Sequence, residues 1–435
     1  MRLLLVPAFL CAALSVAVGQ DRAASPNERP AARLPDSDKS APEGQPKAEG
    51  AKKSRGAVEF RIGYYDNDDD DSSGNPFLDE SLTDIEPVVI VEFQATDKLR
   101  LSLMGSYDLV SSASIARLND YDQRSGASSD NYFGLDLAAR YEASEDFRWN
   151  AHAGASREYD YLSFGFGGGA EIDLLEDNVT LSGGLNVFFD QVTKVIRFNG
   201  QDEGTDNRLS VTVNFGYYQI LSPTVHFSLG TSLTYQSGFL QTAYNGVVLE
   251  DPSRPQSDSL NPDFFLDLPR GGGLPLPGGV SIEAEKLPET RIRVAVFGEI
   301  RKGFPSTGTG LGFATRLYAD DWGIVSAAPE LRLYQWIVQD LLRVRVRYRF
   351  YNQTAADAYD DHFLVPISAR SRDPFRPNKE RTQDADLGAF FSNTIGLKLV
   401  LTPAEGVTVD VGGDYVLRSD GINQLLFSFG VRWEF

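Results

Sequence analysis

The last nine residues of the chain read FSFGVRWEF, from Phe427 to Phe435. Five apolar residues alternate with small or polar ones, namely Phe427, Phe429, Val431, Trp433 and Phe435. Successive side chains of a β-strand point to opposite faces, so this segment predicts a strand with one apolar and one polar face. The last strand of a soluble β-sandwich alternates in the same way, so the segment alone leaves the architecture open.

The rest of the chain supplies the number of strands. From Ala57 onward, 16 strand-like runs are visible, at about residues 57–66, 86–94, 98–109, 131–142, 147–158, 161–174, 179–190, 207–220, 224–236, 290–301, 308–319, 324–337, 341–353, 386–400, 406–418 and 423–435. Every second connection is short, and most of the others are long, at 67–85, 110–130, 191–206, 237–289 and 354–385. Short turns on one side and long loops on the other are typical of outer-membrane barrels.

The two faces of the runs support the same fold. A barrel of about 16 strands encloses a lumen too wide to be filled by its own wall, so the apolar faces must point outward into lipid. We therefore predict an all-β, transmembrane antiparallel β-barrel with about 16 strands, short periplasmic turns and long extracellular loops. The C-terminal segment then resembles the signal that barrel assembly machinery reads, and the expected surroundings are outer-membrane lipid and lipopolysaccharide.

The N-terminus predicts export. Arg2 and the apolar run from Leu3 to Val18 indicate a signal peptide, residues 1–19, with the small residues Ala17 and Gly19 before the cut. Residues 20–56 are rich in Ala, Pro, Ser, Lys and Arg and predict a disordered periplasmic tail. The barrel would then span 57–435, in the outer membrane of a bacterial cell after export through the inner membrane.

Composition excludes several functions. The chain holds 41 Lys+Arg against 61 Asp+Glu, a net charge of −20, so nucleic acid is not an expected partner. The one cysteine, Cys11, lies in the expected signal peptide, which excludes disulfides and cysteine-ligated metal in the mature chain. The three histidines are scattered and no catalytic motif is present, so we expect neither an enzyme nor a cofactor.

The run LLRVRVRYRF, residues 341–350, places four arginines on one face of a strand. Arginine facing lipid at the bilayer midplane costs about 2–4 kcal/mol, so these side chains should face the lumen with those of neighbouring strands. The expected lumen-lining residues are Arg291, Arg293, Arg316, Arg332, Arg343, Arg345, Arg347 and Arg349. They could form a selective constriction or a seat for anionic cargo, or they could pair with carboxylates and only stiffen the barrel.

An acidic loop follows the first run. Asp66, Asp68, Asp70 and Asp71 supply closely spaced hard oxygen ligands that suit calcium, although the EF-hand pattern is not met. A solvated acidic loop is the alternative, so surface calcium is a speculative site.

Several segments resemble one uncharacterised bacterial family, catalogued as a domain of unknown function. They include DDDDSSGNPFLDES, IEPVVIVEFQATDKLRLSL, YQSGFLQTAYN, RLYADDWGI, YRFYNQTAAD, ERTQDADLG and DYVLRSDGINQLLFSFGVRWEF. The resemblance covers about residues 57–435. It implies an outer-membrane barrel, and, through genes found near those of the family, a link to redox proteins of the cell envelope.

Three functions stay open at this stage. The first is a pore or conduit with an arginine-rich lumen wall. The second is a structural sheath or partner for a periplasmic or extracellular redox protein that carries flavin or haem. The third is a surface-binding barrel that uses the loops 67–85, 237–289 and 354–385.

Overall fold

The computed structural model describes residues 55–69, 78–79, 81–112, 115–116, 131–158, 161–196, 201–241, 246–252, 281–361, 363–366 and 380–435. The expected signal peptide and all of the expected tail except Arg55 and Gly56 lie outside these residues.

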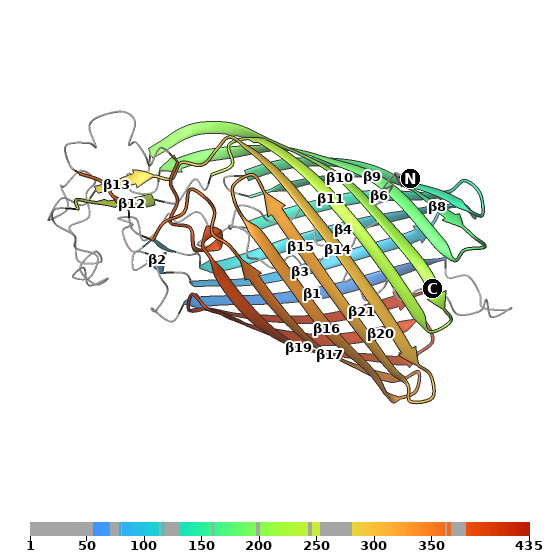
Figure 1. Ribbon diagram of the computed structural model, residues 1–435. Coiled ribbons are helices and arrows are strands. Elements are labelled where there is room, and N and C mark those ends of the chain that lie inside the picture. The colour runs from blue at the N-terminus through green and yellow to red at the C-terminus, as the bar shows by residue number, and fades with distance from the viewer. Residues whose placement is uncertain are drawn as a thin grey trace, which may run out of the picture.

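Sixteen antiparallel strands close into one barrel, as the sequence predicted (Figure 1). Around the ring the order is β1, β21, β20, β19, β17, β16, β15, β14, β11, β10, β9, β8, β7, β6, β4 and β3. The strands are β1 (Gly56–Asp69), β3 (Ser81–Gln94), β4 (Leu99–Ser112), β6 (Asn131–Glu142), β7 (Phe147–Arg157), β8 (Tyr161–Leu174), β9 (Val179–Ile196), β10 (Gln201–Ser222), β11 (Val225–Gly238), β14 (Thr290–Phe304), β15 (Thr309–Asp320), β16 (Val325–Val338), β17 (Leu342–Gln353), β19 (Phe390–Ala404), β20 (Val407–Arg418) and β21 (Ile422–Glu434).

The C-terminal strand closes the ring against the first strand. β1 and β21 pair from Ala57 opposite Glu434 to Asp69 opposite Ile422. The Phe435 N–H donates to the Gly56 carbonyl at 3.0 Å, and its carbonyl accepts from the Arg55 N–H at 2.6 Å. Closure leaves no unpaired sheet edge, which is the condition for strands to cross hydrocarbon.

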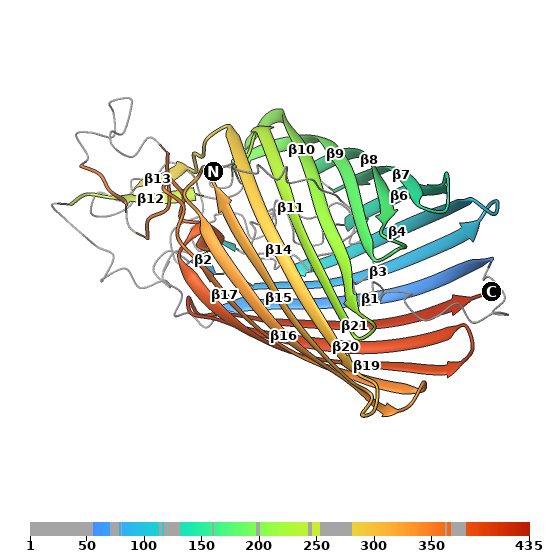
Figure 2. The same cartoon turned by 45° about the vertical axis from the view of Figure 1, so that its right-hand side comes forward.

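Several strands are longer than the alternation predicted, because they continue past the membrane into polar sequence. β1 extends to Asp69, β3 begins at Ser81 and β10 begins at Gln201. The long connections also hold small elements: β2 (Leu78–Asp79) pairs with β5 (Ile115–Ala116), and β12 (Gly246–Glu250), β13 (Ser281–Ala284) and β18 (Phe363–Leu364) form a three-stranded sheet. In Figures 1 and 2, β12 and β13 lie beyond the barrel end opposite to the C-terminus, which is the extracellular end.

The outer face is apolar and the inner face polar. On β16, Leu331 and Leu333 are exposed on the outside. Glu330, which precedes Leu331, points to the other face and is buried on the inside. Aromatic pairs mark the periplasmic rim of the outer face, with ring centroids 5.5 Å apart for Tyr141 and Trp149 and 5.2 Å apart for Trp433 and Phe435. No helix in the described part of the chain is long and apolar enough to cross a membrane.

The lipid-facing assignment predicts the effect of a charge on stability. Leu331 is 58% exposed in the middle of β16, and Leu175 is 72% exposed in the turn between β8 and β9. Leu331→Arg should lower the free energy of unfolding by about 2–4 kcal/mol, because it places a guanidinium in hydrocarbon. Leu175→Arg is the matched control and should change it by less than about 0.5 kcal/mol. Denaturant titration in lipid vesicles measures both, and equal effects would contradict the assignment.

Candidate functional site

The eight expected arginines all lie on β14 to β17, at positions that alternate with exposed apolar side chains. Arg291 and Arg293 alternate with Ile292 and Val294 on β14, and the four arginines of β17 alternate with Val346, Tyr348 and Phe350. Arg316 and Arg332 occupy the same face of β15 and β16, since Arg316 pairs with Ala328 and Arg332 pairs with Arg347 across the register. The eight side chains therefore share the inner wall.

We call the inner faces of β14 to β17 the basic arc. Besides the eight expected arginines it contains Arg301, so nine arginines stand against three acids, Glu299, Asp320 and Glu330, within the described residues 290–353. Some like charges lie directly opposite each other in the register. Arg332 is opposite Arg347, and Arg345 of the arc is opposite Lys398 on β19. Such pairs are unfavourable unless anions lie nearby.

A ladder of alternating charges crosses the arc and compensates part of this repulsion. Arg301 and Arg332 both contact Glu299, at 2.6 and 3.0 Å. Arg332 also pairs with Glu330. Arg347 continues the row, 3.8 Å from Glu330 and 2.7 Å from Asp414 on β20. The ladder thus joins β14 to β20 along the inside of the barrel.

Gly396 makes the last step of the ladder possible. It lies on β19, between the strands that carry Arg347 and Asp414, and pairs with both residues in the register. A Cβ at Gly396 would lie 1.8 Å from Asp414 Oδ1 and 2.7 Å from Arg347 Cγ. The absent side chain lets an ion pair pass over one intervening strand on the inside of the barrel.

The wall opposite to the arc carries acids. β3 and β4 lie eight positions from β14 and β15 in the ring of 16 strands. Their inner faces hold Asp84 and Glu86 on β3 and Asp108 on β4, of which Asp84 and Asp108 are buried. Acids therefore lie across the extracellular part of the lumen from the basic arc.

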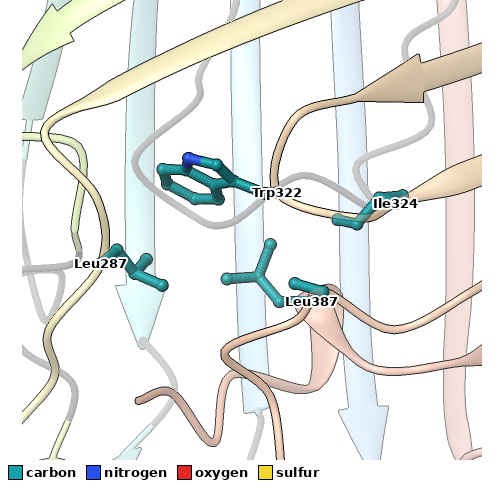
Figure 3. Close-up of a cluster of buried hydrophobic side chains, with 5 residues drawn as sticks. Leu287, Trp322, Ile324 and Leu387 are labelled. Atoms are coloured by element: carbon teal, nitrogen blue, oxygen red, sulfur yellow. The ribbon is translucent and has the colours of Figure 1, made fainter. Parts of the chain in front are cut away.

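The extracellular connections above the arc fold together into a compact layer. We define the cap as residues 285–289, 321–324, 354–361, 380–389 and 419–421. Its apolar centre brings side chains from three connections of the barrel together (Figure 3), namely Leu287, Trp322, Ile324, Ala356 and Leu387. Residues 381–388, which include the 3-10 helix η3 (Ala385–Leu387), are all buried although most are polar.

The cap is bonded to side chains of the inner wall. The Gln353 amide at the end of β17 donates to the carbonyls of Asp386 and Gly388, at 2.9 and 2.6 Å. Arg418 at the end of β20 pairs with Asp386 at 2.6 Å and with Asp420 at 2.5 Å. Since both side chains come from inner-face positions, the cap lies over the lumen and does not splay outward.

Asp320 joins the cap to the basic arc. Its Oδ1 accepts from the backbone N–H groups of Trp322 and Ile324, at 3.1 and 2.9 Å. Its Oδ2 accepts from Arg291 at 2.6 Å, and the Arg291 guanidinium also lies 4.2 Å from the Trp322 ring. One carboxylate therefore sets the position of a cap tryptophan and of an arginine of the arc.

Tyr359 lies at the edge of the apolar centre of the cap. It packs against the apolar centre, and its hydroxyl donates to Asp361 at 2.5 Å. Burial, followed by the hydrogen bond to Asp361, raises the pKa of the Tyr359 phenol above its usual range. Tyr359 is therefore half-buried at the edge of the apolar centre.

Sequence reasoning missed the cap as a structural unit. The segments RLYADDWGI, YRFYNQTAAD, ERTQDADLG and DYVLRSDG stand out in the sequence only as motifs. The structure places Trp322, Ala356 and Leu387 of the first three in the cap and pairs Arg418 of the fourth with it. Their contacts are 30 or more residues apart in the chain and follow no period, so only their shared resemblance to a family pointed to them.

The calcium site stays a prediction. Asp66 and Asp68 are described, and the Asp66 carboxylate accepts from the Thr83 hydroxyl at 2.8 Å. Asp70 and Asp71 lie outside the described residues. Within the described ranges, no group of three His, Cys, Asp or Glu side chains could hold a metal ion.

The ring of 16 strands with an apolar outside and a charged inside defines an outer-membrane β-barrel. The chain belongs to the family described as "Protein of unknown function (DUF3570)", whose model matches residues 125–425. A comparison with curated proteins finds no match. The expectation that the chain is not an enzyme stays a prediction.

Solved structures of outer-membrane proteins are similar in fold. A bacterial polysaccharide outer membrane secretin is 9% identical over 87% of this chain and 98% of its own, with a TM-score of 0.45. OpdK of Pseudomonas aeruginosa, solved with vanillate, is 9% identical over 88% and 98%, with a TM-score of 0.40. The siderophore receptor PirA of Pseudomonas aeruginosa is 10% identical over 82% of this chain and 55% of its own, with a TM-score of 0.37, so this chain spans about half of that receptor.

The glycine at the ladder crossing predicts a stability effect. Gly396→Ala should lower the free energy of unfolding by about 1–3 kcal/mol, because the new methyl group displaces the Arg347–Asp414 pair. Gly412→Ala, on the neighbouring strand, meets nothing nearer than Ser428 Oγ at 3.3 Å and is the matched control. Denaturant titration compares the two variants. If Gly396→Ala is as stable as Gly412→Ala, the Arg347–Asp414 pair can rearrange around the methyl group, and the prediction is wrong.

The Arg418 ion pairs predict how the cap is held. Arg418→Met leaves Asp386 and Asp420 without their shared cation, and removal of one partner of a buried pair costs about 3–5 kcal/mol. Hydrogen exchange of residues 381–388 should speed up by several orders of magnitude. Arg100→Met is the control, since its 3.9 Å contact with Glu92 involves a half-exposed side chain worth at most about 1 kcal/mol. Unchanged protection in Arg418→Met would show that the apolar centre alone holds the cap.

Proposed function

We propose that the protein is exported to the outer membrane and acts there as a passive conduit. Its basic arc favours anionic solutes. The observation that carries this proposal is the excess of nine arginines over three acids on four contiguous inner faces of a closed barrel. Clefts lined by one sign of charge, with walls of low dielectric, concentrate ions of the opposite sign. Arginine is also the side chain best suited to carboxylate and phosphate groups.

The charge ladder supports a division of roles within the arc. Arg301, Arg332 and Arg347 share Glu299, Glu330 and Asp414, so this row is close to neutral and mainly braces the wall. The net positive charge of the arc therefore comes from its other arginines, which outnumber the remaining acids. A stiff wall with a fixed surplus charge suits selective passage better than a stable seat for one ligand.

Ion selectivity in planar bilayers tests the proposal. The wild-type barrel should conduct with a preference for chloride over potassium, measured as a reversal potential in a salt gradient. Arg343→Glu with Arg345→Glu should shift that potential toward potassium, and Arg343→Gln with Arg345→Gln should shift it about half as far, since half the charge is changed. Lys98→Glu, in the exposed turn between β3 and β4, should leave it nearly unchanged.

The absence of channels from correctly folded protein would reject the conduit. It would leave the sheath for a redox partner and the surface-binding barrel, both of which stay predictions. Copurification from native membranes separates these two: a coloured, stoichiometric partner supports the sheath. A bare barrel that loses ligand binding when an extracellular loop is removed supports surface binding.

A further inference from the structure

The described cap differs from the basic arc in the sign of its charge. The cap, as defined above, contains ten acids, Glu285, Glu289, Asp321, Asp357, Asp360, Asp361, Glu380, Asp384, Asp386 and Asp420, against two bases, Lys286 and Arg381. Residues 367–379 of the same connection lie outside the described residues and add four bases and one acid. With them included, eleven acids still exceed six bases.

On the side of the basic arc, the net charge therefore changes sign along the axis of the lumen. A net negative layer lies at the extracellular end, and the arc below it carries nine arginines and three acids within the barrel wall. Gln353, Arg418 and Asp320 fasten the layer to inner-face positions of β17, β20 and β15. An ion that crosses the barrel on this side meets both zones in series.

Backbone hydrogen bonds and the apolar centre hold the segments of the cap together. Backbone hydrogen bonds join its connections, from the Ala356 N–H to the Leu387 carbonyl at 2.8 Å and from the Asp357 N–H to the Trp322 carbonyl at 2.7 Å. Lys286 and Arg381 exchange two more, at 3.0 and 2.8 Å. Opening would break these bonds and expose the apolar centre, so it costs free energy and the cap holds its charges above the arc.

We propose that the conduit rectifies, with a larger current when the extracellular side is positive; this inference rests on the proposed conduit. At that polarity, cations enter through the acidic cap and anions enter through the basic arc, so both carriers accumulate in the lumen. At the opposite polarity, each carrier must first cross the zone of its own sign, and the junction between the zones is depleted of ions. The pore would thus favour anions that leave the periplasm over anions that enter it.

Current–voltage curves in symmetric salt test the inference. The current at about 100 mV with the extracellular side positive should exceed the current at the opposite voltage by at least about twofold at low salt. The ratio should fall toward one in molar salt, because the Debye length shrinks to about 3 Å.

Exposed cap acids provide the decisive variant. Glu289, Asp357, Asp360 and Glu380 are exposed, so Glu289→Gln, Asp357→Asn, Asp360→Asn and Glu380→Gln together should preserve the fold and bring the ratio close to one. The matched control removes four exposed acids of periplasmic turns, by Asp97→Asn, Glu145→Gln, Asp146→Asn and Glu176→Gln. It loses the same charge at the other end and should keep the larger current at extracellular-positive voltage.

A single introduced thiol fixes the orientation of the barrel in the bilayer. Because Cys11 is the only cysteine, Asp360→Cys in the mature chain offers one site at the cap. A membrane-impermeant cationic thiol reagent should lower the ratio when it is added on one side only, and that side is the extracellular one. An ohmic, symmetric current, or a larger current at extracellular-negative voltage, would overturn the inference and leave the conduit standing. No current at all would reject the conduit itself.

Discussion

The barrel depends on one constraint, that no backbone N–H or C=O group can remain unpaired in hydrocarbon. The pairing of β21 with β1, residue by residue from Ala57 to Asp69, is how this chain meets it. Closure creates two faces with different solvents, and the side-chain period of two then assigns every residue of a strand to lipid or to lumen. The charged side chains of β17 are tolerated in a membrane span for that reason.

Closure also decides how the inner charges are compensated. On a concave wall, side chains from strands that are not neighbours approach one another, as Arg347 and Asp414 do across Gly396. Arg61 on β1 reaches Asp410 on β20 at 2.9 Å in the same way, and Lys398 on β19 shares that carboxylate at 3.2 Å. The wall is thus braced by ion pairs between strands that are not neighbours in the ring.

Periodicity explains what the sequence could predict. The 16 runs, their alternating short turns and the inner-face arginines follow from the two-residue period, which is a local property of each strand. The partners of those arginines depend on register and curvature, so Glu299, Glu330 and Gly396 were not singled out before the structure was known. The cap is further from prediction, because Trp322 and Leu387 meet through connections that carry no period.

The cap and the arc both contain ion pairs between arginine and carboxylates, but the pairs differ in burial. In the arc, Arg332 and Arg347 stay partly exposed on the inner wall and share the carboxylates of Glu299, Glu330 and Asp414. At the edge of the cap, Arg418 of β20 is buried against Phe390 and held between two carboxylates, where loss of either partner is costly. A buried ion pair adds little net stability but strongly penalises other arrangements, so Arg418 fixes where the cap sits. In the proposed conduit, the acidic layer would act on ions from one position above the arc, because these contacts hold it there.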